Sequence, residues 1–179
     1  MISVSEAKDF VRNNSQPLSP VCLSLQQAAM KVLAEDVFAL TDIPPFNQSA
    51  MDGYAFHFED YHANKNLNIE GEIPAGYNQN FIIKTQQAVR IFTGAPLPQG
   101  ADTVVMQEKI IVQNNQLFIT NDQIQKGENV RLRGTEITAG APAMTKENYL
   151  SPAAIGFLAG IGIKELRVYP HPAVSIIIT

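Results

Sequence analysis

Residues 44–55 read Pro-Pro-Phe-Asn-Gln-Ser-Ala-Met-Asp-Gly-Tyr-Ala. The stretch places small residues and a single carboxylate between two turn-forming ends, a composition typical of a segment that shapes backbone rather than one that fills a core. The pair Asp52-Gly53 favours a tight turn, because the Asp side chain can bond nearby backbone groups and glycine accepts positive φ. The pattern therefore predicts a carboxylate held on a turn, where it can face a ligand.

Helical patterns occur near both ends of the chain. Ser3 and Glu6 form a capping-box pattern, after which apolar residues recur at helical spacing until Asn13-Asn14. A second helix is expected to start at Ser24 and to run toward Val37. A third is expected over residues 153–159, after a serine N-cap and a first-turn proline.

Between about residues 46 and 140 the pattern changes to short β-like runs separated by Gly, Pro and Asn. Asn114-Asn115 suits a hairpin turn. The best strand candidates are residues 89–92, 103–106, 110–112, 117–120 and 130–132. We therefore expect the mixed α/β class (α+β, mostly β). A discontinuous helix-and-strand domain of residues 1–45 and 141–172 should be interrupted by a β domain of residues 46–140.

Composition limits the compartment and the kinds of partner. The chain has 179 residues, of which 45% are hydrophobic and 17% charged, and this balance indicates a globular protein. A net charge of −4 argues against a nucleic-acid surface, which needs a dense Lys/Arg stripe. The apolar runs are shorter than a membrane helix and no leader pattern occurs, so we expect a cytoplasmic protein without membrane contact. Cys22 is the only cysteine, which excludes an internal disulfide, and it is expected to be buried.

Two regions of the sequence resemble the signature of one family. Residues 47–55 form the first block, Asn-Gln-Ser-Ala-Met-Asp-Gly-Tyr-Ala. Residues 90–98 (Arg-Ile-Phe-Thr-Gly-Ala-Pro-Leu-Pro) and 100–108 (Gly-Ala-Asp-Thr-Val-Val-Met-Gln-Glu) form the second. Both closely resemble blocks of the molybdopterin molybdenumtransferases, the MoeA and gephyrin family. The resemblance covers essentially the whole chain but only about the N-terminal half of the family's protein. It implies that the discontinuous helix-and-strand domain is elongated and that the inserted β domain is barrel-like.

The end of the chain has its own pattern. Residues 173–179 form a continuous apolar, β-branched run, typical of a strand buried on both faces of a parallel sheet. In the family this run resembles the first strand of an α/β domain that binds the pterin. The resemblance therefore implies that residues 173–179 begin a truncated pterin-binding domain, and that the chain alone does not turn over.

For the parent protein the resemblance implies a molybdenum insertase of molybdenum cofactor biosynthesis. Such an enzyme transfers molybdenum from molybdate to adenylylated molybdopterin, with Mg²⁺ as cofactor. The implied partners are a second copy of the chain, in a homodimer, and the protein of the same pathway that produces adenylylated molybdopterin. A second hypothesis is a non-enzymatic dimerisation or scaffold module of gephyrin type, and a third is a stand-alone β-barrel that binds a small sugar or peptide.

Asp52 and Thr93 are the leading candidates for chemistry. From the residues alone, Asp52 can hold a hard cation such as Mg²⁺, and the alternative is that it only caps its turn. The hydroxyl of Thr93 and the backbone N–H groups after it can meet an anion, and the alternative is an ordinary strand exit. By resemblance Asp52, Thr93 and Glu136 are catalytic and Asp52 is the metal ligand. Glu136 lies where family members more usually have Asp.

Further residues are candidates for substrate binding. Arg131 and Arg133 alternate along an extended segment, so they should point the same way and can engage phosphate or molybdate oxygens together. The alternative is a solvated strand face in which they pair with Glu128 or Glu136. The resemblance adds three more substrate-binding residues: Ser49, Met51 and Glu108.

Overall fold

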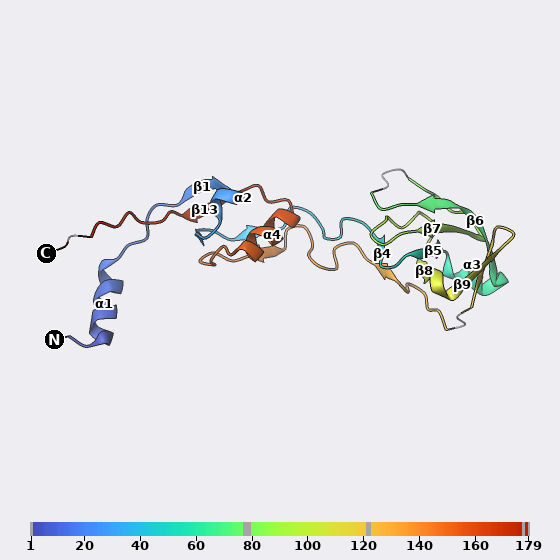
Figure 1. The fold of residues 1–179 in the computed structure, drawn as a ribbon, viewed down its shortest axis with the longest axis horizontal. Coiled ribbons are helices and arrows are strands. Elements are labelled where there is room, and N and C mark those ends of the chain that lie inside the picture. Colours follow the sequence, from blue (N-terminus) through green and yellow to red (C-terminus); the bar gives the residue numbers. More distant parts are fainter. Residues whose placement is uncertain (1, 77–79, 121–122, 177, 179) are drawn as a thin grey trace. The chain divides into compact units, whose positions relative to one another are not determined.

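The computed structural model describes residues 2–76, 80–120, 123–176 and 178 (Figure 1). The chain divides into two compact units. Unit 1 comprises Met1–Thr41 with Ala139–Thr179, and unit 2 comprises Asp42–Thr138. No helix in the described part of the chain is long and apolar enough to cross a membrane.

Unit 1 begins with the predicted capped helix, α1 (Val4–Asn14). The hydroxyl of Ser3 accepts from the backbone N of Glu6 at 3.2 Å, and the Glu6 carboxylate accepts from the backbone N of Ser3 at 2.7 Å. This reciprocal capping box confirms the start of the helix. None of its residues is buried.

The sheets of unit 1 are small and antiparallel. One has the order β1 (Val21–Ser24), β13 (Glu165–Tyr169) and β2 (Val32–Leu33). In the other, β3 (Val37–Phe38) pairs with β12 (Pro142–Met144). Cys22 lies on β1 and is exposed, so the expectation that it is buried was wrong, because β1 is an edge strand of a thin sheet.

The second predicted helix is wrong in length. Ser24 caps a helix as expected, but α2 covers only Leu25–Ala28. Met30 then adopts a left-handed φ of 64°, and the rest of the predicted helix becomes β2 and β3. Pairing with β13 and β12 overrides the helical pattern, since β-branched valines pack well on strands. The third predicted helix is confirmed as α4 (Pro152–Gly160), capped by Ser151.

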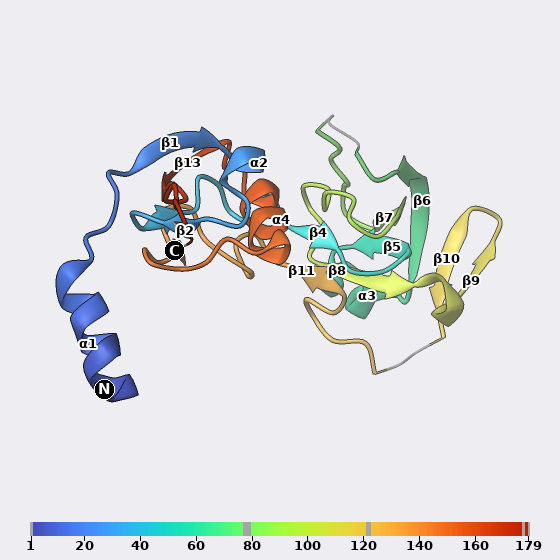
Figure 2. The same cartoon turned by 60° about the vertical axis from the view of Figure 1, so that its left-hand side comes forward.

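Unit 2 is built on one curled, half-barrel sheet of six strands in the order β8-β5-β7-β6-β10-β9, seen in Figure 2. Its strands are β5 (Gly53–Phe56), β6 (Asn66–Ile73), β7 (Gln87–Ile91), β8 (Thr103–Met106), β9 (Ile110–Gln113) and β10 (Gln116–Ile119). Among the paired strands that the structure describes in this sheet, β6 and β7 are parallel and the other pairs are antiparallel. The short strands β4 (Gln48–Ser49) and β11 (Val130–Arg131) form a separate pair.

The predicted strands of the middle region all have counterparts in this unit. Asn114 and Asn115 take positive φ angles of 51° and 62° between β9 and β10, which confirms the hairpin turn. Three strands, β4, β5 and β6, were not expected. The helices of unit 2 are α3 (Phe58–Asn64) and the 3₁₀ turn η1 (Gln107–Lys109).

The sheet of unit 2 carries apolar clusters on both faces. Neighbouring residues of one strand point to opposite faces, so Ala55 and Phe56 of β5 enter different clusters. The cluster around Ala55 includes Ile73, Val89, Ile91 and Val104. The cluster around Phe56 includes Tyr61, Leu67, Val105 and Leu117. Two-sided burial fixes the register of the central strands and thereby the position of the loops at their ends.

The expected strand at residues 173–179 does not form in the part of it that is described. Residues 171–176 and 178 belong to no helix or strand, and positions 177 and 179 lie outside the described residues. Val174, Ile176 and Ile178 are 77%, 85% and 92% exposed. A strand needs neighbours to satisfy its backbone groups, and no described strand pairs with this segment.

Candidate functional site

Asp52 and Thr93 meet at the end of two neighbouring strands. β5 starts directly after Asp52, and β7 ends two residues before Thr93, with Gly53 opposite Ile91 in the antiparallel register. Oδ1 of Asp52 accepts from the backbone N of Thr93 at 2.8 Å and from its Oγ1 at 2.7 Å. The backbone N of Gln107 donates to the Asp52 carbonyl at 3.1 Å. Two distant parts of the sequence thus fix one carboxylate.

These contacts favour the ionised form of Asp52. The backbone hydrogen bond from Thr93 lowers the pKa of Asp52 most, followed by the Thr93 hydroxyl, and the positive charge of Arg90 lowers it further. Oδ2 has no hydrogen-bond or ion-pair partner among the residues that the structure describes. An exposed, ionised carboxylate with one oxygen oriented and the other open can accept from a ligand or coordinate a cation.

The glycine after Asp52 has a different role from the one expected. Gly53 does not take a positive φ; it is the first residue of β5. A Cβ at this position would lie 1.9 Å from the carbonyl oxygen of Val105 on β8. Only glycine therefore permits the close approach of β5 and β8. The expectation of a positive φ was wrong because the bend lies before Gly53, at Ala50 to Asp52.

A surface hollow of about 430 Å³ opens beside this pair. Four of the residues predicted for the site line it: Met51, Asp52, Thr93 and Glu108. Met106, Gln107 and Lys109, at the end of β8 and in η1, complete its wall. The side-chain amide of Gln107 lies 3.4 Å from Oε1 of Glu108. The hollow therefore presents two carboxylates, one hydroxyl and one ammonium group to solvent.

Ser49 is placed beneath this hollow rather than in it. Its side chain is fully buried, and its hydroxyl donates to the carbonyl of Met51 at 2.5 Å and accepts from the backbone N of Met51 at 3.3 Å. Its backbone N donates to Ala95, and its carbonyl accepts from Gly94. Ser49 therefore joins the bend before Asp52 to the turn after Thr93.

Besides Ser49, three further predicted residues do not line the hollow. Arg133 forms an ion pair with Asp42, and its backbone N donates to the side chain of Asn47 at 2.9 Å. The alternative expectation, pairing with Glu128 or Glu136, named the wrong acids, because Asp42 is distant in the sequence. Arg131 lies exposed on β11 opposite Gln48. Glu136 is exposed, and its backbone N donates to Ile43.

The donor set suits a cation that a ligand helps to hold. In the described ranges there is no group of three or more His, Cys, Asp or Glu side chains that could hold a metal ion alone. Asp52 and Glu108, however, line the same hollow. Mg²⁺ is commonly bound through one or two carboxylates together with phosphates of its ligand. The residues present therefore fit Mg²⁺ only in company with an anionic ligand.

Comparison with known proteins identifies the family. Residues 2–162 match the family model described as the MoeA N-terminal region (domain I and II). The chain belongs to the MoeA N-terminal region family. The solved MoeA protein of Pyrococcus horikoshii OT3, titled a molybdopterin biosynthesis protein, superposes with a TM-score of 0.84 at 28% identity. The superposed region covers 94% of this chain and 46% of the Pyrococcus chain, so the two proteins share the MoeA fold over that region.

The curated relatives are named molybdopterin molybdenumtransferase. The relative from Nostoc sp. is 40% identical over 162 residues, which are 88% of this chain and 37% of the relative. The relative from Staphylococcus aureus (strain MSSA476) is 34% identical, over 99% of this chain and 43% of its own length. The chain thus spans less than half the length of these MoeA relatives, and it is homologous to their N-terminal part.

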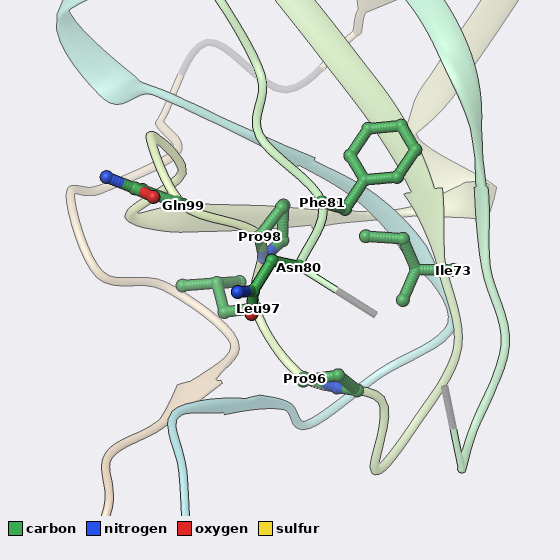
Figure 3. Close-up of a pocket in the computed structure, with 7 residues that line it drawn as sticks. All are labelled: Ile73, Asn80, Phe81, Pro96, Leu97, Pro98 and Gln99. Atoms are coloured by element: carbon green, nitrogen blue, oxygen red, sulfur yellow. The ribbon is translucent and has the colours of Figure 1, made fainter. Parts of the chain in front are cut away.

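A second pocket of this MoeA region, about 270 Å³ in volume, is chemically different (Figure 3). It is lined by Ile73, Asn80, Phe81 and the segment 96–99. Its described lining includes no ionisable side chain and none of the predicted site residues. Among the described residues, the chemistry-bearing side chains are therefore gathered at the hollow of Asp52 and not at this pocket.

Sequence reasoning missed three polar residues near the hollow. Gln107 and Lys109 were hidden because η1 was not anticipated. Arg90 lies inside the second MoeA-like block, and the alternation of β7 would have placed it on the same strand face as Phe92. That alternation of side chains along the strand was the sequence signal from which the position of Arg90 could have been predicted.

Proposed function

We propose that this chain serves as the N-terminal part of a molybdopterin molybdenumtransferase, which transfers molybdenum from molybdate to adenylylated molybdopterin. The observation that carries the proposal is the meeting of Asp52 and Thr93 in one hollow, since each comes from a different MoeA-like block. Residues selected for a shared chemistry must meet in space, whereas residues that only shape loops need not.

In this proposal Thr93 orients the Asp52 carboxylate through Oδ1, and Oδ2 of Asp52 faces the ligand. Asp52, with Glu108 beside it, would hold Mg²⁺ against the pyrophosphate linkage, and the cation when bound would offset the charge of that linkage. Lys109 offers a compensating positive charge in the same hollow. Met51 contributes an apolar wall, and buried Ser49 supports the bend behind it.

The arginines and Glu136 take supporting roles in this proposal. Arg131 is exposed and available to an oxyanion such as molybdate, whereas Arg133 is already paired with Asp42. Glu136 would act only if the bound substrate reaches beyond the hollow. We also propose a homodimer, in the cytoplasm, that receives adenylylated molybdopterin from the protein that makes it.

A second candidate function is assembly without chemistry. Many large apolar side chains of unit 1 are exposed, among them Phe10, Phe38 and Phe157. An interaction surface would bury such side chains. Molybdate-dependent release of AMP separates the two functions, because a scaffold would release none.

The test replaces the carboxylate of Asp52 by an amide in a chimera with a full-length relative. This chain is substituted for the matching region of the Nostoc relative, and molybdate-dependent AMP release with Mg²⁺ is measured for Asp52→Asn. The amide keeps an acceptor for Thr93 but loses the charge, so we expect turnover to fall about 100-fold, which is about 2.7 kcal/mol on the barrier. The control is Glu70→Gln, an exposed carboxylate of β6 outside the hollow.

The same assay includes the 179-residue chain alone, for which we expect no turnover. Thermal melts of each variant show whether the fold survives. Equal turnover of Asp52→Asn and Glu70→Gln would contradict the proposed role of Asp52, and turnover by the isolated chain would show that no further domain is needed.

A further inference from the structure

Arg90 stands on the strand that leads into Thr93. Its neighbours on β7, Val89 and Ile91, are fully buried on one face of the sheet. Arg90 points to the opposite face, and its side chain is 43% exposed. In the register it lies opposite Tyr54, two residues after Asp52 on the partner strand. Asp52 is therefore a diagonal neighbour of Arg90, and a long side chain can reach such a position.

Two contacts hold the guanidinium of Arg90. Its Nε lies 3.8 Å from Oε2 of Glu72, which occupies the adjacent position on β6. Its Cζ lies 5.0 Å from the centre of the Phe92 ring, on the same face of the same chain segment. A cation between a carboxylate and an aromatic face is held from two sides, and the planar guanidinium suits both contacts.

Phe92 connects this arrangement to the site. It is bonded directly to Thr93, whose backbone N and hydroxyl both donate to Asp52. β7 ends at Ile91, so no ladder pairing holds Phe92 and Thr93. Turn bonds hold the segment instead: the backbone N of Ala95 donates to the Phe92 carbonyl at 2.9 Å, and that of Gly94 donates to the Ser49 carbonyl at 2.9 Å. The contact between Arg90 and the ring adds a side-chain restraint to this turn, on the side of Phe92.

We propose that Arg90 is a positioning residue of the Asp52–Thr93 site: held by Glu72 and Phe92, it fixes the end of β7 from which Thr93 donates to Asp52. The inference deepens the proposed function and rests on it for the chemical role of the site. The contacts of Arg90 with Glu72 and Phe92 are independent of that function. Arg90 does not line the hollow. It acts through Phe92 and Thr93.

The first test measures amide hydrogen exchange in the 179-residue chain. The Thr93 amide is protected by Asp52, and the Val89 amide lies in the buried centre of the same strand. In Arg90→Gln we expect Thr93 to exchange about tenfold faster while Val89 is unchanged, because a local restraint is lost. Equal acceleration at both amides would indicate general destabilisation and would overturn the proposal.

Two more variants keep the test decisive. Glu72→Gln loosens Arg90 from the other strand and leaves the residues next to Thr93 unaltered, so Thr93 should again exchange faster than Val89. Lys84→Gln removes an exposed positive charge three residues before β7 and should leave both amides unchanged. If Arg90→Gln does not fold, Glu72→Gln decides. No selective change at Thr93 in the folded variants overturns the proposal.

Activity supplies the second readout. In the chimera with the Nostoc relative, Arg90→Gln should lower kcat about tenfold with little change in KM, because the carboxylate is misplaced and not removed. Arg90→Lys should recover part of the loss. An inactive chimera with the unaltered chain would count against the proposed function alone, since the exchange experiment needs no turnover. Unchanged kcat in an active chimera would overturn the role of Arg90.

Discussion

The two units differ in how their apolar side chains are used. In unit 2 the central strands bury residues on both faces of one sheet, and two clusters of fully buried side chains result. In unit 1, α1 buries no residue, and α4 is apolar throughout yet buries only Leu158. The candidate site lies entirely in unit 2. The site thus lies on a sheet whose central strands are held by side chains buried on both faces, which suits a site that needs fixed geometry.

The exposed apolar residues of unit 1 suit a different task. They include aromatic and branched side chains that a monomeric surface seldom gathers in such number: Phe10, Val11, Phe38, Leu40 and Phe157. Such residues at a two-fold interface would be buried by the same surface of a second copy. In the proposed enzyme we therefore expect catalysis on unit 2 and self-association through unit 1.

The largest expected effect comes from adding one methyl group to each unit. Gly53→Ala places a Cβ against the backbone of Val105, which cannot move without separating β5 from β8. We expect unit 2 to lose at least about 3 kcal/mol of unfolding free energy. Gly156→Ala on α4 meets nothing within 4 Å and should stabilise unit 1 by about 0.5–1 kcal/mol, since alanine favours helices.

Urea unfolding, followed through amide signals of each unit separately, measures both changes. The two variants serve as controls for each other. If Gly53→Ala unfolds at the same urea concentration as the unaltered chain, the close approach of β5 and β8 does not require glycine at position 53, and the explanation of Gly53 is wrong.

A smaller effect is expected when a charge is placed on each surface. Phe157→Glu alters an aromatic side chain of α4 that is 44% exposed, and Ile111→Glu alters an aliphatic side chain of β9 that is 49% exposed. A charge at a self-association surface is costly, so Phe157→Glu should raise the dimer dissociation constant at least about tenfold. Ile111→Glu should leave it unchanged, because unit 2 is not assigned to the interface.

Light scattering and sedimentation equilibrium across micromolar concentrations give the two dissociation constants. A monomeric chain at high micromolar concentration would contradict the homodimer proposal itself. Dissociation by Ile111→Glu in place of Phe157→Glu would reverse the assignment of the two units.

Local signals in the sequence predicted the elements that depend on local contacts. The capping box at Ser3 and the serine-proline start of α4 fixed two helices, and the paired asparagines fixed a hairpin. The helix expected from Ser24 failed because its second half pairs with strands more than 100 residues later in the chain. The described residues of the run at 173–179 form no strand for the converse reason, since a buried strand cannot form without neighbours.

The same division applies to the site. The two MoeA-like blocks indicated Asp52 and Thr93, and the structure brings them together. The burial of Ser49, the pairing of Arg133 with Asp42 and the role of Gly53 are set by contacts between distant segments. No spacing rule within a block reveals such contacts, so they were missed.

The smallest expected effect compares one carboxylate from each unit. Thr93 lowers the pKa of Asp52 below its ordinary value of 3.8, and the backbone and hydroxyl of Ser3 lower the pKa of Glu6 below 4.5. Because both folded-state values are lowered, each contribution to stability is present above the unfolded pKa and is lost as pH falls through the folded value. Carboxyl NMR titration should show Thr93→Val raising the pKa of Asp52 alone, and Ser3→Ala raising that of Glu6 alone. Each variant is thus the control for the other. If Thr93→Val leaves the pKa of Asp52 unchanged, the Thr93 hydroxyl does not orient the carboxylate.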